Sequence, residues 1–254
     1  MTNAKNLNIL LVGETWIVQK FHTKGFDMIP LGGYEDFSQW FRDALSKYSD
    51  LDLTHIPNHL VLSEFPKTPE DMEKFDVIVL SDVGRNTLSL YPEMFKVPMG
   101  PDKLKSVKKF VESGGGLVMS GGWMSFQGYQ GRASYHGTPI EDALPVKISE
   151  WDDRVEVTEG IAPDILKENH PILSDIPSKD WPKFLGYNRL EAKEDATVIA
   201  KFGVDPSIVV NSYGKGRTMA FASDLAPHWG TDFVKWEFYP KFWHNSLRWL
   251  AGEV

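Results

Sequence analysis

The stretch at residues 113–128, SGGGLVMSGGWMSFQG, constrains the fold of this chain more than any other. Three glycines follow a segment with helical spacing, a short apolar run comes next at 117–119, and a second glycine pair opens a polar, aromatic loop. This order predicts a helix, a turn, a buried strand and a sharp turn into a loop. Ligands of α/β sheets bind at the carboxyl ends of the strands, because helices cover both faces. We therefore expect a site close to residues 121–128.

The flanking sequence alternates the same two patterns. Buried strands are predicted at residues 7–12, 51–56, 77–80 and 117–119, and helical patterns lie between them at 34–49, 69–75 and 102–113. Parallel strands need such crossover connections, so the alternation predicts a mainly parallel α/β sheet with helices on both faces. Further strands are predicted at 196–202, 207–213 and 217–222, and a closing helix at 240–251. We expect one domain over residues 1–254, with a β-containing insertion at about 146–195 that packs against the sheet.

Composition excludes several classes of protein. A formal net charge of -8 without any basic run argues against a nucleic-acid partner, which would need clustered lysine and arginine. The apolar run at residues 9–12 is too short for a signal peptide or a membrane span, so we expect a cytoplasmic protein with no membrane partner. The chain has no cysteine, which excludes disulfides, thiolate metal sites and a cysteine nucleophile.

Polar residues follow the predicted strands where a site is expected. These are Glu14, Asp82 and Asp224 at strand ends, with His22, His136 and His228 in the adjoining loops. Such a cluster could hold a divalent metal, or it can supply a general acid and a general base, and we predict catalytic roles for Glu14, Asp82 and His228. The alternative is that the carboxylates cap helices and bond loop amides while the histidines satisfy backbone groups. No sequential spacing supports a metal, and we predict neither metal nor cofactor.

Aromatic and amide side chains lie in the same loops. Aromatic ring faces beside carboxylates and amides suit a flat, polyhydroxylated ligand, so a small, sugar-like molecule is one candidate. The predicted ligand-binding residues are Trp16, His22, Gly121, Gly122, Trp123, Ser125, Gln127, Tyr135, His136, Asp224 and Trp229. The alternative is that several of these aromatic residues roof the core or are buried against another copy of the chain in a homo-oligomer.

Three well-known motifs are absent around the glycine-rich stretch. The G-x-S-x-G turn of serine hydrolases needs glycines two before and two after the serine, and neither Ser120 nor Ser125 has them. A phosphate-binding G-x-x-x-x-G-K-[ST] loop and a G-x-G-x-x-G opening a helix are also missing. The sequence therefore argues against a serine nucleophile and a nucleotide ligand.

Several segments together resemble a known family over nearly the whole chain. They are GETW, HTKGFD, LSDVGRNTL, GGGLVMSGGWMSFQG, YHGTPIEDALPV, DDRVEV, HPIL, LGYNR and GKGRTMAFASDLAPHW. The chain resembles bacterial class I glutamine amidotransferase-like proteins, which are related to trehalose-utilisation type proteins. The resemblance implies a flavodoxin-like three-layer sandwich, with a pocket where the amidotransferases have their active site.

The turn after the central strand departs from that family. True amidotransferases carry a cysteine nucleophile there, which a histidine activates and a glutamate orients. This chain has Gly122 and Trp123 instead, so thiolate-based glutamine hydrolysis is excluded, whereas His228 follows the last strand as the amidotransferase histidine does. Two functions remain open: a small-molecule enzyme with no covalent cysteine step, and a binding or assembly protein that retains the pocket.

Overall fold

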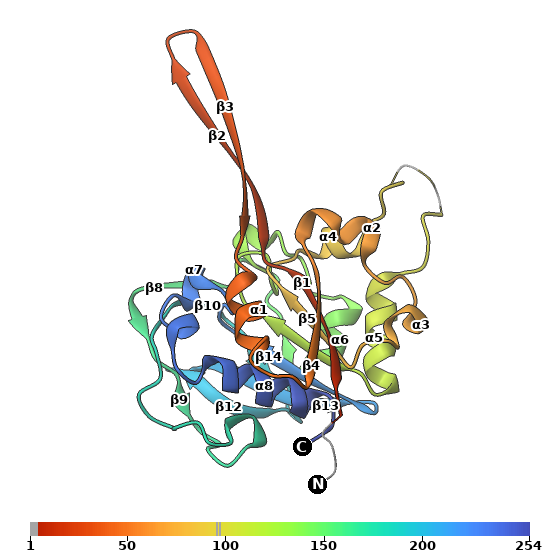
Figure 1. Cartoon of the computed structure of the whole chain (residues 1–254), viewed down its shortest axis with the longest axis vertical. Helices are drawn as coiled ribbons and strands as arrows, with labels where there is room; N and C mark the ends of the chain where they lie inside the picture. Colours follow the sequence, from red (N-terminus) through yellow and green to blue (C-terminus); the bar gives the residue numbers. More distant parts are fainter. Residues whose placement is uncertain (1–4, 95, 97) are drawn as a thin grey trace.

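A large mixed sheet forms the centre of the molecule (Figure 1). The computed structural model describes residues 5–94, 96 and 98–254. Within these residues the sheet has eight strands in the order β4-β1-β5-β6-β14-β13-β12-β9. Their bounds are β1 Leu7–Gly13, β4 Leu51–Ile56, β5 Val77–Ser81, β6 Gly116–Ser120, β9 Asp164–Ile165, β12 Thr197–Phe202, β13 Asp205–Tyr213 and β14 Gly216–Phe221. Pairing is parallel from β4 to β14 and antiparallel from β14 to β9, which agrees with the predicted mainly parallel sheet.

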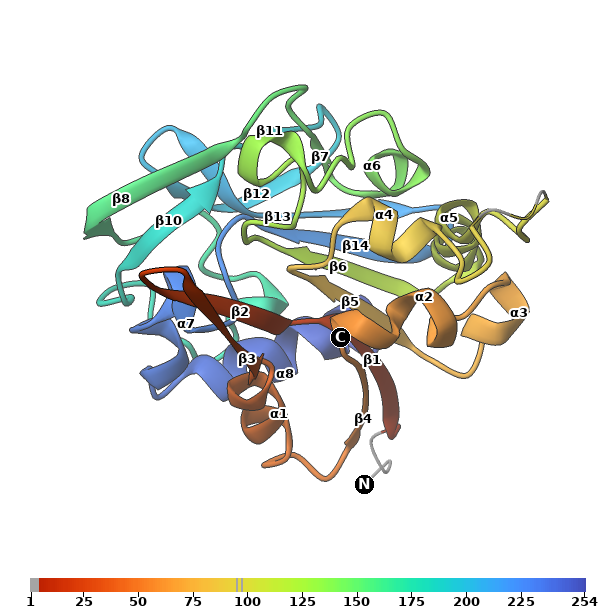
Figure 2. The same cartoon turned by 90° about the horizontal axis from the view of Figure 1, so that it is seen from above.

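Helices cover both faces of this sheet, as the resemblance implied (Figure 2). The α-helices are α1 Gln39–Leu45, α2 Val61–Glu64, α3 Pro69–Met72, α4 Arg85–Ser89, α5 Lys103–Ser113, α6 Pro139–Ala143, α7 Pro227–Gly230 and α8 Tyr239–Leu250. Single 3-10 turns are η1 Asn58–Leu60, η2 Tyr129–Gly131, η3 Pro171–Leu173 and η4 Phe233–Lys235. Helices α1 and α8 lie on one face, and α5 and α6 lie on the other. The three layers make this a flavodoxin-like α/β sandwich.

Amphipathic helices and fully buried strands explain this layering. Helix α5 begins after Asp102, whose carboxylate accepts hydrogen bonds from the amides of Leu104 and Lys105 and so caps the helix. All residues of β5 and β6 are buried, because helices shield both sides of the parallel strands. The carboxyl ends of β1, β5, β6 and β14 therefore meet at one edge of the sheet, where the site is expected.

The largest departure from prediction is a long β-hairpin at the carboxyl end of β1. Strands β2 Thr15–Lys24 and β3 Asp27–Asp36 pair with each other and protrude from the body (Figure 1). The predicted helix at 34–49 is therefore wrong at its start, since residues 34–36 belong to β3 and the helix spans only Gln39–Leu45. The apolar residues do follow helical spacing from residue 37 onward. Before residue 37 the side chains alternate between two faces, as in a strand.

The segment at 146–195, predicted as a β-containing insertion, forms short strands around the sheet. They are β7 Val146–Lys147, β8 Arg154–Ile161, β9 Asp164–Ile165, β10 Phe184–Asn188 and β11 Glu191–Ala192. Strand β9 joins the edge of the main sheet, while β8 pairs with β10 and β7 pairs with β11. The β8–β10 pair lies beside α7, so it is close to the carboxyl edge (Figures 1 and 2).

Candidate functional site

A cavity of about 450 Å³ lies at the carboxyl edge of the parallel strands. Its lining residues are Glu14, Trp16, Val18, Glu35, Phe37, Asp82, Trp123, Asp224, Ala226, Pro227 and His228. The loops after β1, β5, β6 and β14 thus bring Glu14, Asp82, Trp123 and His228 together, as the topology predicts. The walls are mainly apolar, and the ionisable groups come from residues close to the strand ends.

Glu14 is the first residue after β1 and is held in the left-handed region, with φ of 59°. Its side chain is buried, and one carboxyl oxygen accepts a hydrogen bond from the Ser81 hydroxyl. Burial, reinforced by the negative charges of Asp224 and Asp82, raises the pKa of Glu14 well above its usual value. The site therefore favours the protonated form of this carboxyl.

Asp82 has the equivalent place after β5, again with positive φ (46°). Its Oδ1 accepts a hydrogen bond of 2.5 Å from the Met124 amide, and its own amide donates to the Ser125 hydroxyl. Burial and the charge of Asp224 raise the pKa of Asp82 to about 7. Asp82 can therefore both take up and release a proton near neutral pH. It also accepts a hydrogen bond from a loop amide, which is the structural role that the sequence left open as an alternative.

Asp224 and His228 form an ion pair across the first turn of α7. The distance from Asp224 Oδ2 to His228 Nδ1 is 3.4 Å, and Asp224 Oδ1 accepts a hydrogen bond from the Ala226 amide. Burial lowers the pKa of His228, but bonding to Asp224 and the charges of Asp224, Asp82 and Glu156 outweigh burial, so the pKa is raised. The imidazole is thus oriented by a carboxylate, and its proton affinity is increased.

Trp123 forms a wall of the cavity from the loop after β6. Its indole stacks on Tyr129 and meets the His228 ring edge to face, with 5.1 Å between ring centroids in both contacts. The indole nitrogens of Trp123 and Trp229 donate to the two carboxylate oxygens of Glu156, at 3.3 and 2.9 Å respectively. Sequence reasoning missed Glu156, although it lies in the DDRVEV segment that carried the family resemblance.

The glycine pair after β6 allows the backbone to pass close to other groups. A Cβ at Gly122 would lie 2.6 Å from Asp82 Oδ1, and one at Gly121 would lie 2.3 Å from the Ala222 carbonyl oxygen. Gly122 also has a positive φ of 146°. Neither glycine is among the residues that line the cavity, and both let the backbone pass close to Asp82 and Ala222.

Other predicted ligand-binding residues also lie outside the cavity lining: His22, Ser125, Gln127, Tyr135, His136 and Trp229. His22 is exposed on the hairpin, because this segment is a strand and not a loop at the sheet edge. The Ser125 hydroxyl accepts from the Asp82 amide, and the Gln127 side chain donates to the Glu150 carbonyl oxygen.

The remaining three side chains among these also have local partners. The buried Tyr135 hydroxyl donates to the Val83 carbonyl oxygen. His136 Nδ1 lies 2.8 Å from the Ile148 carbonyl oxygen. Trp229 is buried and stacks behind the His228 ring. For these residues the structural alternative describes the observed contacts.

Two buried polar residues that the sequence did not single out hold the loop after β6. Asp153 accepts hydrogen bonds from the amides of Gln127 and Gly128 and from the Asn188 side chain. Asn188 in turn accepts from the Gly122 amide at 2.9 Å. These contacts join the β8–β10 pair to the loop that carries Trp123, so they position one wall of the cavity.

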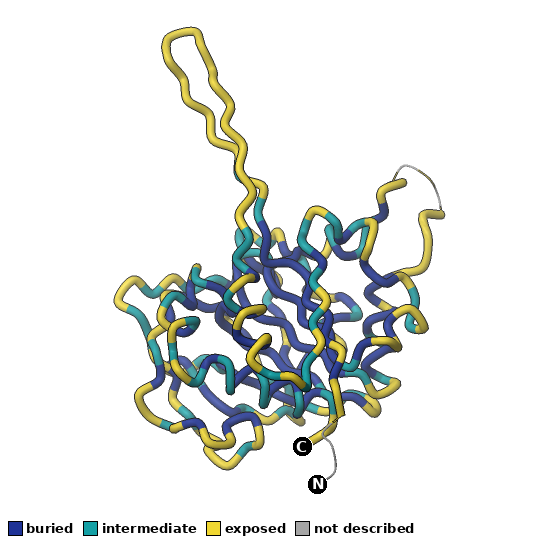
Figure 3. Tube along the Cα trace, viewed as in Figure 1, coloured by how far each residue is buried: buried dark blue, intermediate teal, exposed yellow. Residues whose placement is uncertain are grey.

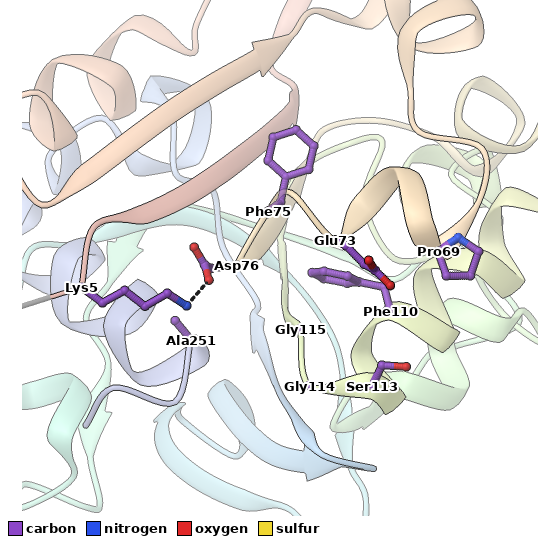
Figure 4. A pocket seen from close by; sticks show the side chains of 10 residues that line it. All are labelled: Lys5, Pro69, Glu73, Phe75, Asp76, Phe110, Ser113, Gly114, Gly115 and Ala251. Atoms are coloured by element: carbon purple, nitrogen blue, oxygen red, sulfur yellow. Dashed lines mark hydrogen bonds and ion pairs between the residues drawn. The ribbon is translucent and has the colours of Figure 1, made fainter.

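Another hollow, of about 370 Å³, lies at the opposite, amino edge of the strands (Figure 4). Figure 4 shows Lys5 and Asp76 paired at its rim, at 2.6 Å. Asp76 also accepts from the Asn8 amide, so it ties the starts of β1 and β5 together. No histidine is among the described residues that line this hollow, so its carboxyl groups have no imidazole beside them. We therefore place the candidate site at the carboxyl edge.

No group of three or more histidine, aspartate or glutamate side chains is placed to hold a metal ion in the part of the chain that the structure describes. None of the helices built from those residues is long and apolar enough to cross a bilayer.

Comparison with known proteins gives one clear assignment. Two solved structures are similar to almost the whole chain: the cytoplasmic proteins STM3548 from Salmonella typhimurium and STM1381 from Salmonella typhimurium LT2. Both are 38% identical to it. STM3548 has a TM-score of 0.90, and the match covers 95% of this chain and 98% of that protein's chain. STM1381 has a TM-score of 0.91, and the match covers 96% of this chain and 99% of that protein's chain.

A β-galactosidase from Bacillus circulans sp. alkalophilus is 13% identical, with a TM-score of 0.52 over 99% of this chain and 32% of its own, which shows the fold alone. None of the curated proteins matches the chain. A family model described as "Putative glutamine amidotransferase" matches residues 8–252. The chain therefore belongs to the glutamine amidotransferase-like family, and it does so without the cysteine of a glutaminase.

Proposed function

We propose that this protein is an enzyme that catalyses proton transfer on a neutral small molecule, without a covalent cysteine step. The observation that carries the proposal is the convergence of three buried carboxyl groups and one imidazole on a single cavity. Titratable groups whose pKa values are shifted by burial and by each other are typical of catalytic sites. A cytoplasmic location is in line with the two Salmonella proteins.

The carboxyl groups and the imidazole would divide the acid and base roles. Glu14 would act as the general acid, because burial and neighbouring charges keep its proton bound. His228 would act as the general base, with Asp224 holding Nδ1 and leaving Nε2 for the ligand. Asp82, with a pKa of about 7, would exchange a proton with either group between turnovers.

The lining supports a polar but uncharged ligand with an apolar face. Trp16, Phe37 and Trp123 supply apolar surface for stacking, while the carboxyl groups of Glu14 and Asp82 can bond hydroxyls. An anionic ligand would meet the charges of Asp224 and Glu35 and would be repelled. A sugar or sugar-derived molecule fits these requirements, and glutamine hydrolysis does not, because it needs a thiol.

The experiment combines a ligand screen with two substitutions in the site. Neutral sugars, sugar lactones and amides would be screened by thermal shift, and each hit would be followed by NMR for conversion. Glu14→Gln and His228→Ala should lower turnover of a converted ligand by roughly 10²–10⁴-fold, the usual contribution of a general acid or base. The fold should persist, which circular dichroism and the melting temperature would check.

His136→Ala is the matched control, because this exposed histidine contacts Ile148 and Glu141 and does not line the cavity. It should leave turnover unchanged. Wild-type turnover in both site variants would contradict the proposed roles. If hits bind at this cavity but none is converted by the wild-type protein, the alternative of a non-catalytic binding protein replaces the enzyme.

A further inference from the structure

The β2–β3 hairpin forms an arm that protrudes from the body and contacts the described part of the chain near its base, where the Tyr34 ring meets the His59 ring (Figures 1 and 3). Each strand has ten residues, and from Gln19 to Tyr34 every one of them is exposed. A two-stranded hairpin on its own is at best marginally stable in water. An arm of this length therefore needs a surface that covers one of its faces.

The pairing register shows which face this is. Residues opposite each other on antiparallel strands share a face, and Ile17 pairs with Tyr34, Gln19 with Gly32, Phe21 with Pro30, and Thr23 with Met28. These eight residues make up what we call the uncharged arm face, because none of them carries a charge at neutral pH. The opposite face carries Lys20, His22, Lys24, Asp27 and Glu35 together with Ile29 and Leu31, and its base lines the cavity with Trp16 and Val18.

The uncharged arm face exposes large apolar side chains to water. The exposed fractions are 67% for Ile17, 58% for Phe21, 63% for Met28 and 53% for Tyr34. Alternation of an uncharged apolar face with a charged face is the pattern of a sheet that packs on one side only. Contiguous exposed apolar surface of this kind marks an interaction site.

We propose that the uncharged arm face packs against the same face of a second copy of this chain. Of the 14 large hydrophobic side chains exposed in the described residues, seven lie on the arm: four on this face, Phe26 at the tip, and Ile29 and Leu31 on the opposite face. The other seven are spread over separate segments between Met94 and Val254. The arm therefore gathers more exposed apolar side chains than any other described segment, and the uncharged arm face of a second copy is a surface of matching character. Contact between identical faces is also what a closed two-fold dimer requires.

The area of the arm face fits such a dimer. Aromatic side chains bury on the order of 150 to 250 Å² each, so Phe21, Tyr34 and the tip residue Phe26, with Ile17, Met28 and Pro30 beside them, approach the roughly 800 Å² that each partner contributes to a stable interface. No residue of the uncharged arm face is charged at neutral pH, so pairing of two such faces leaves no buried charge unpaired.

The dimer would also support the candidate site. Trp16, Val18 and Glu35 lie at the base of the arm and form one wall of the cavity. Fixing the arm would therefore order that wall. The contact itself does not depend on the proposed reaction, so the oligomeric state tests it separately.

Single cysteines can test the contact cleanly, because the natural chain has none. Gln19→Cys and Thr23→Cys lie on the uncharged arm face, and Lys20→Cys and Lys24→Cys are matched controls one residue away on the opposite face. With a short bismaleimide, the first pair should form covalent dimers and the controls should not. Equal cross-linking from both faces would overturn the proposal.

Light scattering of the full chain over a micromolar concentration series supplies the second measurement. The wild-type protein should have the mass of a dimer, and Phe21→Lys with Met28→Lys should give monomers, whereas Lys20→Ser should leave the dimer intact. Circular dichroism would verify that the double variant folds. A wild-type monomer, a dimer that survives the double substitution, or a monomer that floats with anionic lipid vesicles through Phe21 would each overturn the proposal.

Discussion

Glu14 and Asp82 share an uncommon backbone conformation at the ends of adjacent strands. Both have positive φ, at 59° and 46°, although neither is glycine. Such residues cost on the order of 1 to 3 kcal/mol each and persist only where surrounding contacts determine them. Here the Glu14 amide donates to the Ser81 carbonyl oxygen and the Asp82 amide donates to the Ser125 hydroxyl. Backbone strain at two cavity residues is in keeping with a functional site.

Gly122→Ala should destabilise the protein by about 1 to 3 kcal/mol and disturb the cavity. The added Cβ would lie 2.6 Å from Asp82 Oδ1, at a φ that L side chains rarely adopt. Gly137→Ala is the control, since it also has positive φ but no atom within 4 Å of the added Cβ, and it should cost only about 1 kcal/mol. Urea unfolding measures the stability of both variants. Equal losses of stability would argue against a close approach of Asp82 to the added Cβ at Gly122.

Asp82→Asn should change how stability depends on pH. The pKa of Asp82 rises from 3.8 to about 7 on folding, so the native state binds its proton more tightly than the unfolded chain does. Wild-type stability therefore falls as the pH rises from about 3.8 to 7, and asparagine avoids this loss while still accepting from the Met124 amide.

The Asp82→Asn variant should thus exceed the wild type above pH 7 by up to a few kcal/mol in free energy of unfolding. The two proteins should be nearly equal at pH 4, which serves as the internal control. Denaturant titrations across this range provide the measurement, and a difference that stays constant with pH would be at odds with a raised pKa.

The loop after β6 is an element whose shape depends on a neighbouring pair of strands. Asp153 precedes β8 and Asn188 ends β10, and together they bond the amides of Gly122, Gln127 and Gly128. Glu156 on β8 bonds the indole of Trp123. The segment at 146–195 therefore does more than pack against the sheet, because it holds one wall of the cavity in place.

Asp153→Ala should cost roughly 2 to 5 kcal/mol of stability, because it leaves buried amides without an acceptor. It should also weaken ligand binding, since Trp123 would no longer be held. Asp152→Ala is the neighbouring control, with a partly exposed carboxylate that pairs with Arg154, and it should cost about 1 kcal/mol or less. Thermal and urea unfolding compare the stability of the two variants. Similar losses of stability would show that the buried hydrogen bonds of Asp153 contribute no more than the surface pair of Asp152.

At the scale of the whole molecule, the fold of this family places a cavity at the carboxyl edge of the sheet. The parallel strands bring their carboxyl ends to that edge, and His228 lies after the last of them. The chain has no cysteine, so the cavity has no thiol nucleophile.

Purified protein incubated with glutamine should therefore release no ammonia above the buffer background. A coupled glutamate dehydrogenase assay measures this, with a cysteine-dependent amidotransferase as the positive control. Ammonia release that disappears in His228→Ala would reveal glutaminase chemistry by another nucleophile and would contradict the assignment made here.

The sequence alone was sufficient to predict the α/β sandwich and the edge that carries the cavity. Strand and helix patterns in the central sheet are local, because each buried strand reads as a short apolar run and each helix shows its own spacing. Chain order then places the residues that follow parallel strands at one edge of the sheet. The sequence therefore predicts that Glu14, Asp82, Trp123, Asp224 and His228 lie close together.

Only the tertiary structure decided the rest. The hairpin was missed because its residues beyond the base are exposed, so its sequence lacks the buried apolar run that marks the strands of the main sheet. Asp153, Glu156 and Asn188 act on the loop after β6 from 25 to 66 residues away, a distance that local patterns do not reach. The raised pKa values of Glu14 and Asp82 likewise come from burial and from the nearby charge of Asp224, and both causes exist only once the chain has folded.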